Sequence, residues 1–204
     1  MFITFEGVDG SGKSTQARQL YETLKEHDIN VVLTREPGGA PGAEEIRRLL
    51  VEGDPDRWSP ETELLLFNAA RRDHLERTIR PALEQGMVVL CDRFADSTRA
   101  FQVAGNPELI DAVEILHRTM IGIEPDLTLI LDIDPIKTRN RGLKTDESRF
   151  EEKGLLFQET VRDAYLDLAE GHPSRCFVFD ADRAIDEIAD EIEAFVVEQL
   201  SDSY

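Results

Sequence analysis

Residues 6–15, EGVDGSGKST, begin at the last residue of the run MFITFE (1–6) and restrict the possible folds of this chain more than any other stretch. They fit the pattern G-x-x-x-x-G-K-[ST] through Gly7, Gly12, Lys13 and Ser14, and a helical pattern begins at the lysine. A strand, a glycine-rich loop and a helix in this order form a cradle for phosphate. Loop N–H groups turn inward, and the helix N-terminus carries partial positive charge. The stretch therefore predicts an α/β fold that binds a nucleoside triphosphate.

The residues of this loop have expected tasks. Lys13 should bridge the β- and γ-phosphates of ATP, and the Ser14 hydroxyl should ligate Mg²⁺. The expected ATP-binding set is Gly7, Val8, Asp9, Gly10, Ser11, Gly12, Lys13, Ser14 and Thr15. The alternative, a glycine-rich turn without a ligand, is not favoured because strand, loop, lysine and helix occur together.

Five apolar runs predict strands, at residues 1–6, 30–34, 87–92, 127–133 and 175–181. Most of them lack alternation, which is typical of strands covered on both faces. Helical patterns occupy residues 13–27, 60–86, 106–122 and 184–200. Because strands alternate with helices, we expect right-handed crossovers and a mainly parallel sheet.

Charge and composition exclude some partners. The net charge is −19, from 42 acidic and 23 basic residues, so the surface should repel a DNA or RNA backbone. No long apolar run predicts a membrane-spanning helix, and the first residues do not resemble a signal peptide, so we expect a cytoplasmic protein. Cys91 and Cys176 lie in strand-like runs and should be buried, reduced thiols.

A phosphate loop alone does not separate a switch, a motor and a kinase. A GTPase should carry N-K-x-D, but no Asn here is followed by Lys. The D-x-x-G match from Asp9 to Gly12 lies inside the phosphate loop itself. The chain also lacks the length expected of a motor. A small-molecule kinase remains.

Three further stretches identify the kinase class. TREPGG (34–39) follows the second predicted strand, LFNAARRDH (66–74) lies on the long predicted helix, and CDRFADSTRAFQ (91–102) follows the third strand. Together with FEGVDGSGKST they resemble the thymidylate kinase family, in the same order and along the whole chain. The resemblance implies a three-layer P-loop NTPase fold with five parallel strands, in one domain over residues 1–204. It also implies transfer of the ATP γ-phosphoryl group to dTMP, giving dTDP, by a homodimer.

The resemblance assigns residues to the phosphate and base of dTMP. Arg93 should bind the dTMP phosphate, with Asp92 near Mg²⁺ or its waters. Phe67 should stack on thymine, and Arg71, four residues further along the same helix face, should donate to O4. Taken without the resemblance, Asp92 and Arg93 could form a structural pair, and Phe67 could belong to the core.

The resemblance also assigns the rest of the dTMP pocket. Phe101 stands where the family usually has Tyr, so it should still crowd the sugar 2′ position but without a hydroxyl group. Further matches are Asp9 at the sugar 3′-hydroxyl, Glu36, Pro37 and Arg47 closing the site, and Ser97, Thr98 and Gln102 lining it. Arg47 could equally be a solvated helix charge, and Arg35 could belong to an internal ion pair.

The polar segment 134–154 predicts either a surface loop with a short helix or a lid, placed at about residues 137–153. The phosphate loop holds no arginine between Val8 and Ser11, so by resemblance the lid should supply one. Its candidates are Arg139, Arg141 and Arg149, the last in SRFE, where Ser148 replaces the family's Asp. The predicted catalytic set is Lys13, Asp92, Arg93, Arg141 and Arg149, with Ser14 and Asp92 as metal ligands.

Two alternatives remain at this stage. One is a P-loop kinase for another nucleoside monophosphate, and the other is a nucleotide-binding regulatory module with low turnover. FNAAR and DRFADSTRAFQ argue against the first, and the missing GTPase signatures together with the full set of acceptor-site residues argue against the second.

Overall fold

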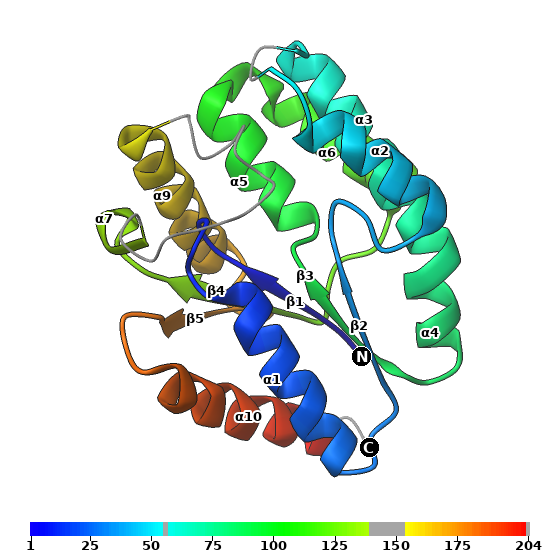
Figure 1. Ribbon diagram of the computed structural model, residues 1–204, viewed down its shortest axis with the longest axis vertical. Helices are drawn as coiled ribbons and strands as arrows, with labels where there is room; N and C mark the ends of the chain where they lie inside the picture. Colours follow the sequence, from blue (N-terminus) through cyan, green and yellow to red (C-terminus); the bar gives the residue numbers. More distant parts are fainter. Residues whose placement is uncertain (55–56, 139–153, 203–204) are drawn as a thin grey trace.

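The computed structural model describes residues 1–54, 57–138 and 154–202, and within them a five-stranded sheet lies at the centre (Figure 1). The strands are β1 (Phe2–Glu6), β2 (Val31–Arg35), β3 (Val88–Asp92), β4 (Leu127–Asp132) and β5 (Cys176–Asp180). Their order is β2-β3-β1-β4-β5, and every neighbouring pair is parallel. The predicted fold class, a parallel five-stranded sheet flanked by helices, is confirmed.

Helices cover both faces of the sheet. In Figure 1, α1 and α10 lie against one face, and α5 and α9 against the other. The longer helices are α1 (Lys13–Glu26), α2 (Pro41–Val51), α3 (Pro60–His74), α5 (Ala95–Gly105), α9 (Leu155–Gly171) and α10 (Ile185–Asp202). The short ones are η1 (Leu75–Ile79), α4 (Arg80–Glu84), η2 (Pro107–Leu109), α6 (Ile110–Leu116), η3 (His117–Ile121) and α7 (Pro135–Thr138).

The double covering explains the continuous apolar runs. Every residue of β1 is buried, and Ile3, Phe5, Leu90 and Leu129 are fully enclosed in the core. The two cysteines are free thiols, buried as expected. No helix among the described residues is both long and apolar enough to cross a bilayer.

The long helix predicted at 60–86 is divided in three. It begins with Ser59, whose hydroxyl accepts the Thr62 N–H, and runs as α3 to His74. A π-helical turn, η1, then leads into α4, where Pro81 lacks the N–H that a regular helix would use.

Candidate active site

The phosphate loop joins the central strand β1 to α1, and Lys13 lies on its inner side. Lys13 is only 6% exposed, and its ammonium group donates to the carbonyls of Gly7 (3.1 Å) and Val8 (2.7 Å). Burial and then repulsion from Arg93 lower the pKa of Lys13 to about 8. The side chain is therefore still largely protonated at neutral pH, where it can bind phosphate.

Two positions in the loop require glycine. Gly7 has a φ of 137°, and a Cβ there would lie 2.6 Å from the Leu131 carbonyl oxygen of β4. Gly12, with a φ of 100°, precedes α1 in the left-handed conformation. Gly7 thus lets the loop pass close to β4, and Gly12 turns it into the helix.

Ser14 and Asp92, the predicted metal ligands, are in contact. The Ser14 hydroxyl donates to Oδ2 of Asp92, while Oδ1 is buried and has no hydrogen-bond partner in the described parts of the chain. No cluster of three or more His, Cys, Asp or Glu side chains suited to a metal occurs within residues 1–54, 57–138 and 154–202. A hydroxyl and an unsatisfied carboxylate oxygen nevertheless fit Mg²⁺, which takes few protein ligands and completes its shell with phosphate and water.

Arg93 follows β3 in a strained conformation. Its φ is 71°, which bulky residues rarely adopt outside functional sites. The guanidinium group pairs with Asp9, donates to the Ser97 hydroxyl (3.0 Å) and lies 4.9 Å from the ring centre of Phe101. These contacts hold the cation at the carboxyl end of β3, where parallel sheets bind their ligands.

The first pocket is open to solvent on one side, and about 530 Å³ of space, part of it solvent, lies between its walls. Its lining residues are Asp9, Glu36, Pro37, Val51, Phe67, Arg71, Arg93, Ser97, Thr98, Phe101 and Gln102. Apart from Arg47, every residue predicted for dTMP lines this pocket. Val51 was missed, because nothing in its sequence context separates it from an ordinary core residue of α2.

A buried chain of polar contacts fixes Arg71 in this pocket. Its Nε donates to Glu36 Oε2 (2.7 Å) and Nη2 to the Phe94 carbonyl (2.9 Å). The other oxygen of Glu36 lies 3.0 Å from His74 Nδ1, and His74 Nε2 lies 2.7 Å from the Thr34 hydroxyl. Arg71 therefore enters the pocket in one orientation, set by Glu36, which also lines the pocket, and by Phe94, His74 and Thr34, which do not.

The second pocket is larger, with an empty volume of about 1400 Å³. Its walls are the loop and first turn from Asp9 to Gln16, the residues Arg35, Glu36, Arg47, Asp92 and Arg93, and the segment after β5 with Ala181, Arg183, Ile185 and Ile188. The segment after β5 was missed, although its place at the carboxyl end of a parallel strand could have indicated it.

Asp9, Glu36 and Arg93 line both pockets, so the two spaces meet at these side chains. Arg47 lines the second pocket instead of the first, and donates to the Pro37 carbonyl (2.7 Å). Gly7 and Val8 are absent from both linings, and their carbonyl oxygens accept hydrogen bonds from Lys13. Arg139, Arg141, Ser148 and Arg149 lie outside the described residues.

Comparisons with known proteins agree on one family. The family model described as thymidylate kinase matches residues 5–192. The chain is 56% identical to the thymidylate kinase of Ruegeria pomeroyi, covering 98% of this chain and 96% of that one, and 59% identical to that of Dinoroseobacter shibae, covering 94% of each. A crystal structure of thymidylate kinase from Ehrlichia chaffeensis superposes with a TM-score of 0.79 at 38% identity, covering 96% of this chain and 97% of that one.

Proposed function

Because the chain belongs to the thymidylate kinase family and transfers the γ-phosphoryl group of ATP to dTMP, we propose that transfer takes place where its two pockets meet. The observation that carries the proposal is the shared wall of Asp9, Glu36 and Arg93. ATP occupies the larger pocket beside the phosphate loop, and dTMP occupies the smaller one.

On the donor side, Lys13 binds the β- and γ-phosphates of ATP. The loop from Asp9 to Thr15 surrounds these phosphates with backbone N–H groups at the N-terminus of α1. Gly7 and Val8 orient Lys13 through their carbonyl oxygens. Ser14 and Asp92 would hold Mg²⁺, which would supply positive charge to the phosphates of ATP.

On the acceptor side, Arg93 binds the phosphate of dTMP. Phe67 stacks on thymine, Arg71 donates to O4, Phe101 crowds the sugar 2′ position and Asp9 meets the 3′-hydroxyl. The remaining walls are Glu36, Pro37, Ser97, Thr98 and Gln102, with Arg47 closing the site from the donor side.

The reaction needs no strong general base. A phosphate oxygen of dTMP, already ionised at neutral pH, attacks the γ-phosphorus of ATP while the bond to the bridging oxygen breaks. That oxygen leaves with ADP, carrying the electron pair of the broken bond. Lys13 and Arg93 neutralise the charge on the transferring group, so catalysis consists of positioning and electrostatic stabilisation.

The lid at about residues 137–153 completes this arrangement, in one kinase domain over residues 1–204. Arg141 and Arg149 act on the transferring phosphoryl group, and closure of the lid excludes water and so prevents hydrolysis of ATP. Substitution of either arginine by alanine should lower kcat more than it raises the dTMP KM.

We also infer a homodimer in the cytoplasm, with no nucleic-acid or membrane partner. Large apolar side chains are exposed on α2, α3, α6 and η3, among them Leu65 (56% exposed) and Met120 (51%). A second copy of the chain, with the same apolar patch, is the occupant that suits it. The two free thiols and the use of ATP suit a reducing compartment.

Incubation with ATP, Mg²⁺ and a panel of nucleoside monophosphates tests the acceptor. We expect dTMP to become dTDP fastest, and a kinase for another monophosphate is not favoured. For the site, Lys13→Ala should abolish transfer without unfolding the protein. Full activity of folded Lys13→Ala would remove the phosphate loop from the mechanism.

A further inference from the structure

Glu6, the last residue of β1, is a carboxylic acid enclosed in the core. Its exposed fraction is 0%, and it directly precedes the phosphate loop without lining either pocket. Burial of an ionisable carboxyl group is unfavourable unless its oxygens are well hydrogen-bonded. The contacts that satisfy Glu6 therefore indicate why the chain tolerates it there.

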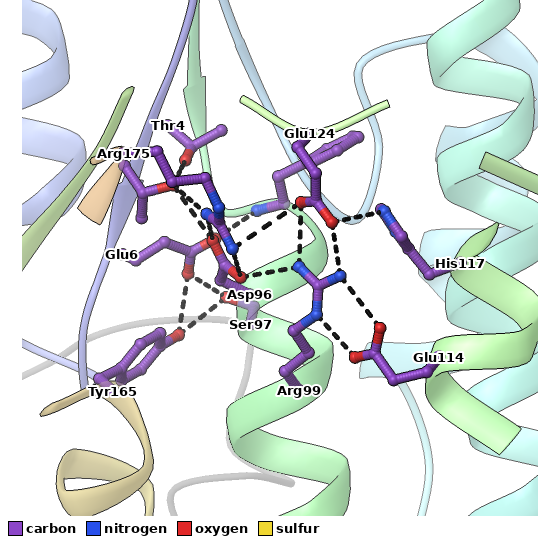
Figure 2. A network of polar contacts seen from close by, with 12 residues as sticks. Thr4, Glu6, Asp96, Ser97, Arg99, Glu114, His117, Glu124, Tyr165 and Arg175 are labelled. Carbon is purple, nitrogen blue, oxygen red and sulfur yellow. Dashed lines mark hydrogen bonds and ion pairs between the residues drawn. The ribbon is translucent and has the colours of Figure 1, made fainter. Parts of the chain in front are cut away.

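Three donors converge on Glu6 from elements far apart in the sequence (Figure 2). Oε1 accepts the Phe94 N–H (2.7 Å) at the start of α5. Oε2 accepts the hydroxyl groups of Ser97 (2.6 Å) on α5 and Tyr165 (2.8 Å) on α9, which Figure 2 shows pointing toward it. The carboxylate thus joins β1 to the N-terminal turn of α5 and to α9.

Ser97 connects this carboxylate to Arg93. A serine hydroxyl has one proton, and here it goes to Glu6, so the lone pairs of the oxygen can accept Nη1 of Arg93 (3.0 Å). If Glu6 carried a proton on Oε2, this oxygen would itself be a donor and a poorer acceptor, so it could no longer accept both hydroxyl groups as well. The ionised carboxylate is the form that suits the observed contacts.

Burial and the charges around Glu6 determine the pH at which it ionises. Burial, and then repulsion from the carboxylate of Asp96, raise the pKa of Glu6 to about 7, while Arg93, Ser97 and the Phe94 N–H oppose the rise. The ionisable groups that face Glu6 are Lys13 on α1, Cys91 and Arg93 at the end of β3, Asp96 on α5, Tyr165 on α9 and Cys176 on β5.

Asp96 itself stays ionised, because Arg175 and Arg99 lower its pKa against the effect of burial. Arg99 also binds Glu114 (2.8 Å) and Glu124 (2.6 Å), which completes the network drawn in Figure 2. Glu6 therefore lies between Asp96, which stays ionised, and the guanidinium group of Arg93 in the active site.

We propose that Glu6 is a positioning residue for the phosphoryl acceptor: its carboxylate orients Ser97, and through it the guanidinium group of Arg93 that receives the dTMP phosphate. This inference rests on the proposed role of Arg93. It makes transfer to dTMP dependent on the protonation of a residue that touches neither substrate. Activity should rise with pH as Glu6 ionises, near pH 7.

Glu6→Gln tests the proposal, because glutamine keeps the shape, can accept the Phe94 N–H and cannot ionise. Its amide would donate to Ser97 instead of accepting from it. At pH 8 we expect kcat/KM for dTMP to fall by about tenfold to a hundredfold, as for loss of a charged hydrogen bond, while the KM for ATP changes little. An equal effect on the KM for both substrates, or none on either, would overturn the proposal.

The dependence of activity on pH distinguishes a positioning role of Glu6 from a purely structural one. The dTMP phosphate itself titrates near pH 6 (about the value of other phosphate monoesters), so the acid limb of the wild-type profile should contain two ionisations. The Glu6→Gln profile should contain one, and the alkaline limb due to Lys13 should be common to both proteins. A Glu6→Gln profile with the wild-type acid limb would refute the assignment.

Tyr165→Phe is the matched control and the second variant. It removes one donor to Glu6 but leaves Ser97 and Arg93 in place, so the acid limb should move to higher pH while kcat at pH 8.5 stays close to wild type. If Glu6→Gln does not fold, this shift decides the question alone. An acid limb that Tyr165→Phe does not move would contradict the proposal.

Arg93→Lys tests separately the premise that Arg93 binds the dTMP phosphate, on which the role of Glu6 depends. Lysine keeps the charge but loses the two-pronged geometry, so the dTMP KM should rise and kcat should fall. Wild-type kinetics in Arg93→Lys would remove Arg93 from the acceptor site, and the role of Glu6 with it. A defective Arg93→Lys beside a normal Glu6→Gln would exclude Glu6 alone.

Discussion

At the scale of single residues, Lys13 and Glu6 are both ionisable and buried beside the phosphate loop. Burial disfavours the charged form of each, so it lowers the pKa of Lys13 to about 8 and raises that of Glu6 to about 7. At pH 7 Lys13 is therefore mostly protonated, whereas Glu6 is only partly ionised. The ionisation of both residues should therefore be visible in function and in stability.

The Lys13 pKa predicts how ATP affinity depends on pH. The protonated lysine binds phosphate, so affinity should be constant below pH 7 and fall above pH 8, by about tenfold at pH 9. Calorimetric titration with a non-hydrolysable ATP analogue at pH 7 and pH 9 measures this. Lys13→Met should bind weakly at both values and show no such fall. An affinity that is equal at both values in the wild type would contradict the assignment.

The Glu6 pKa predicts an unusual effect on stability. Because the folded-state pKa lies above the ordinary 4.5, the stability contribution of Glu6 is complete below pH 4.5 and is lost as pH rises through about 7. Glu6→Gln avoids this loss, which amounts to at most about 3 kcal/mol at pH 8. Thermal unfolding at pH 8 should thus give a higher Tm for Glu6→Gln than for wild type, with the difference shrinking toward pH 5. A lower Tm at pH 8 would indicate that the carboxylate stabilises the fold.

Arg71 predicts the order of acceptable bases. Thymine and uracil present an acceptor at O4, whereas cytosine presents an amino donor to the guanidinium group. An unpaired buried donor costs about 1–3 kcal/mol, so dCMP should react about tenfold to a hundredfold less efficiently than dTMP, with dUMP between them. Arg71→Ala should reduce the gap by depressing dTMP turnover. Measured kcat/KM values for the three monophosphates would disprove the assignment if dCMP matched dTMP.

At the scale of elements, α5 shows where the apolar pattern fails. Its buried positions include Asp96, Thr98, Arg99 and Gln102, so polar residues occupy the face that normally identifies a helix. The helix α9 was also missed, since it buries little more than Val161 and Tyr165. The five strands, by contrast, could be predicted to within one or two residues because each is a short, mostly apolar run.

The buried ion pairs of α5 predict that loss of Arg99 strongly lowers the free energy of unfolding. Arg99 contacts the carboxylates of Asp96, Glu114 and Glu124, and its removal would leave a buried anion short of partners. Arg99→Met should reduce the free energy of unfolding by about 3–5 kcal/mol, measured by urea denaturation. As the matched control, Arg77→Met removes a cation that is paired with Asp73 at the surface, and it should change stability little. Similar losses in the two variants would contradict the predicted importance of the network.

At the scale of the whole molecule, the exposed apolar side chains predict association. Leu65 on α3 is exposed, as are Leu49 on α2, Ile115 on α6 and Met120 on η3. Leu65→Glu places a charge at a self-complementary interface and should convert a dimer to a monomer, whereas Ile136→Glu, exposed elsewhere, should not. Sedimentation analysis measures both, and a monomeric wild type would exclude the dimer.

The motifs could be predicted from the sequence because they are local, but the walls of the pockets could not. Ala181, Arg183, Ile185 and Ile188 reach the phosphate loop only through the β1-β4-β5 order of the sheet. Glu6 was overlooked for a related reason. Its partners Ser97 and Tyr165 lie 91 and 159 residues away, and no spacing in the sequence indicates that they meet.

The wall shared by the two pockets has a consequence for binding equilibria. Asp9, Glu36 and Arg93 belong to both pockets, so we expect each nucleotide to act as a heterotropic effector of the other. Reciprocity requires that the factor by which ATP changes the dissociation constant of dTMP equals the factor by which dTMP changes that of ATP. The cellular supply of one nucleotide thereby sets the concentration of the other that half-saturates the protein.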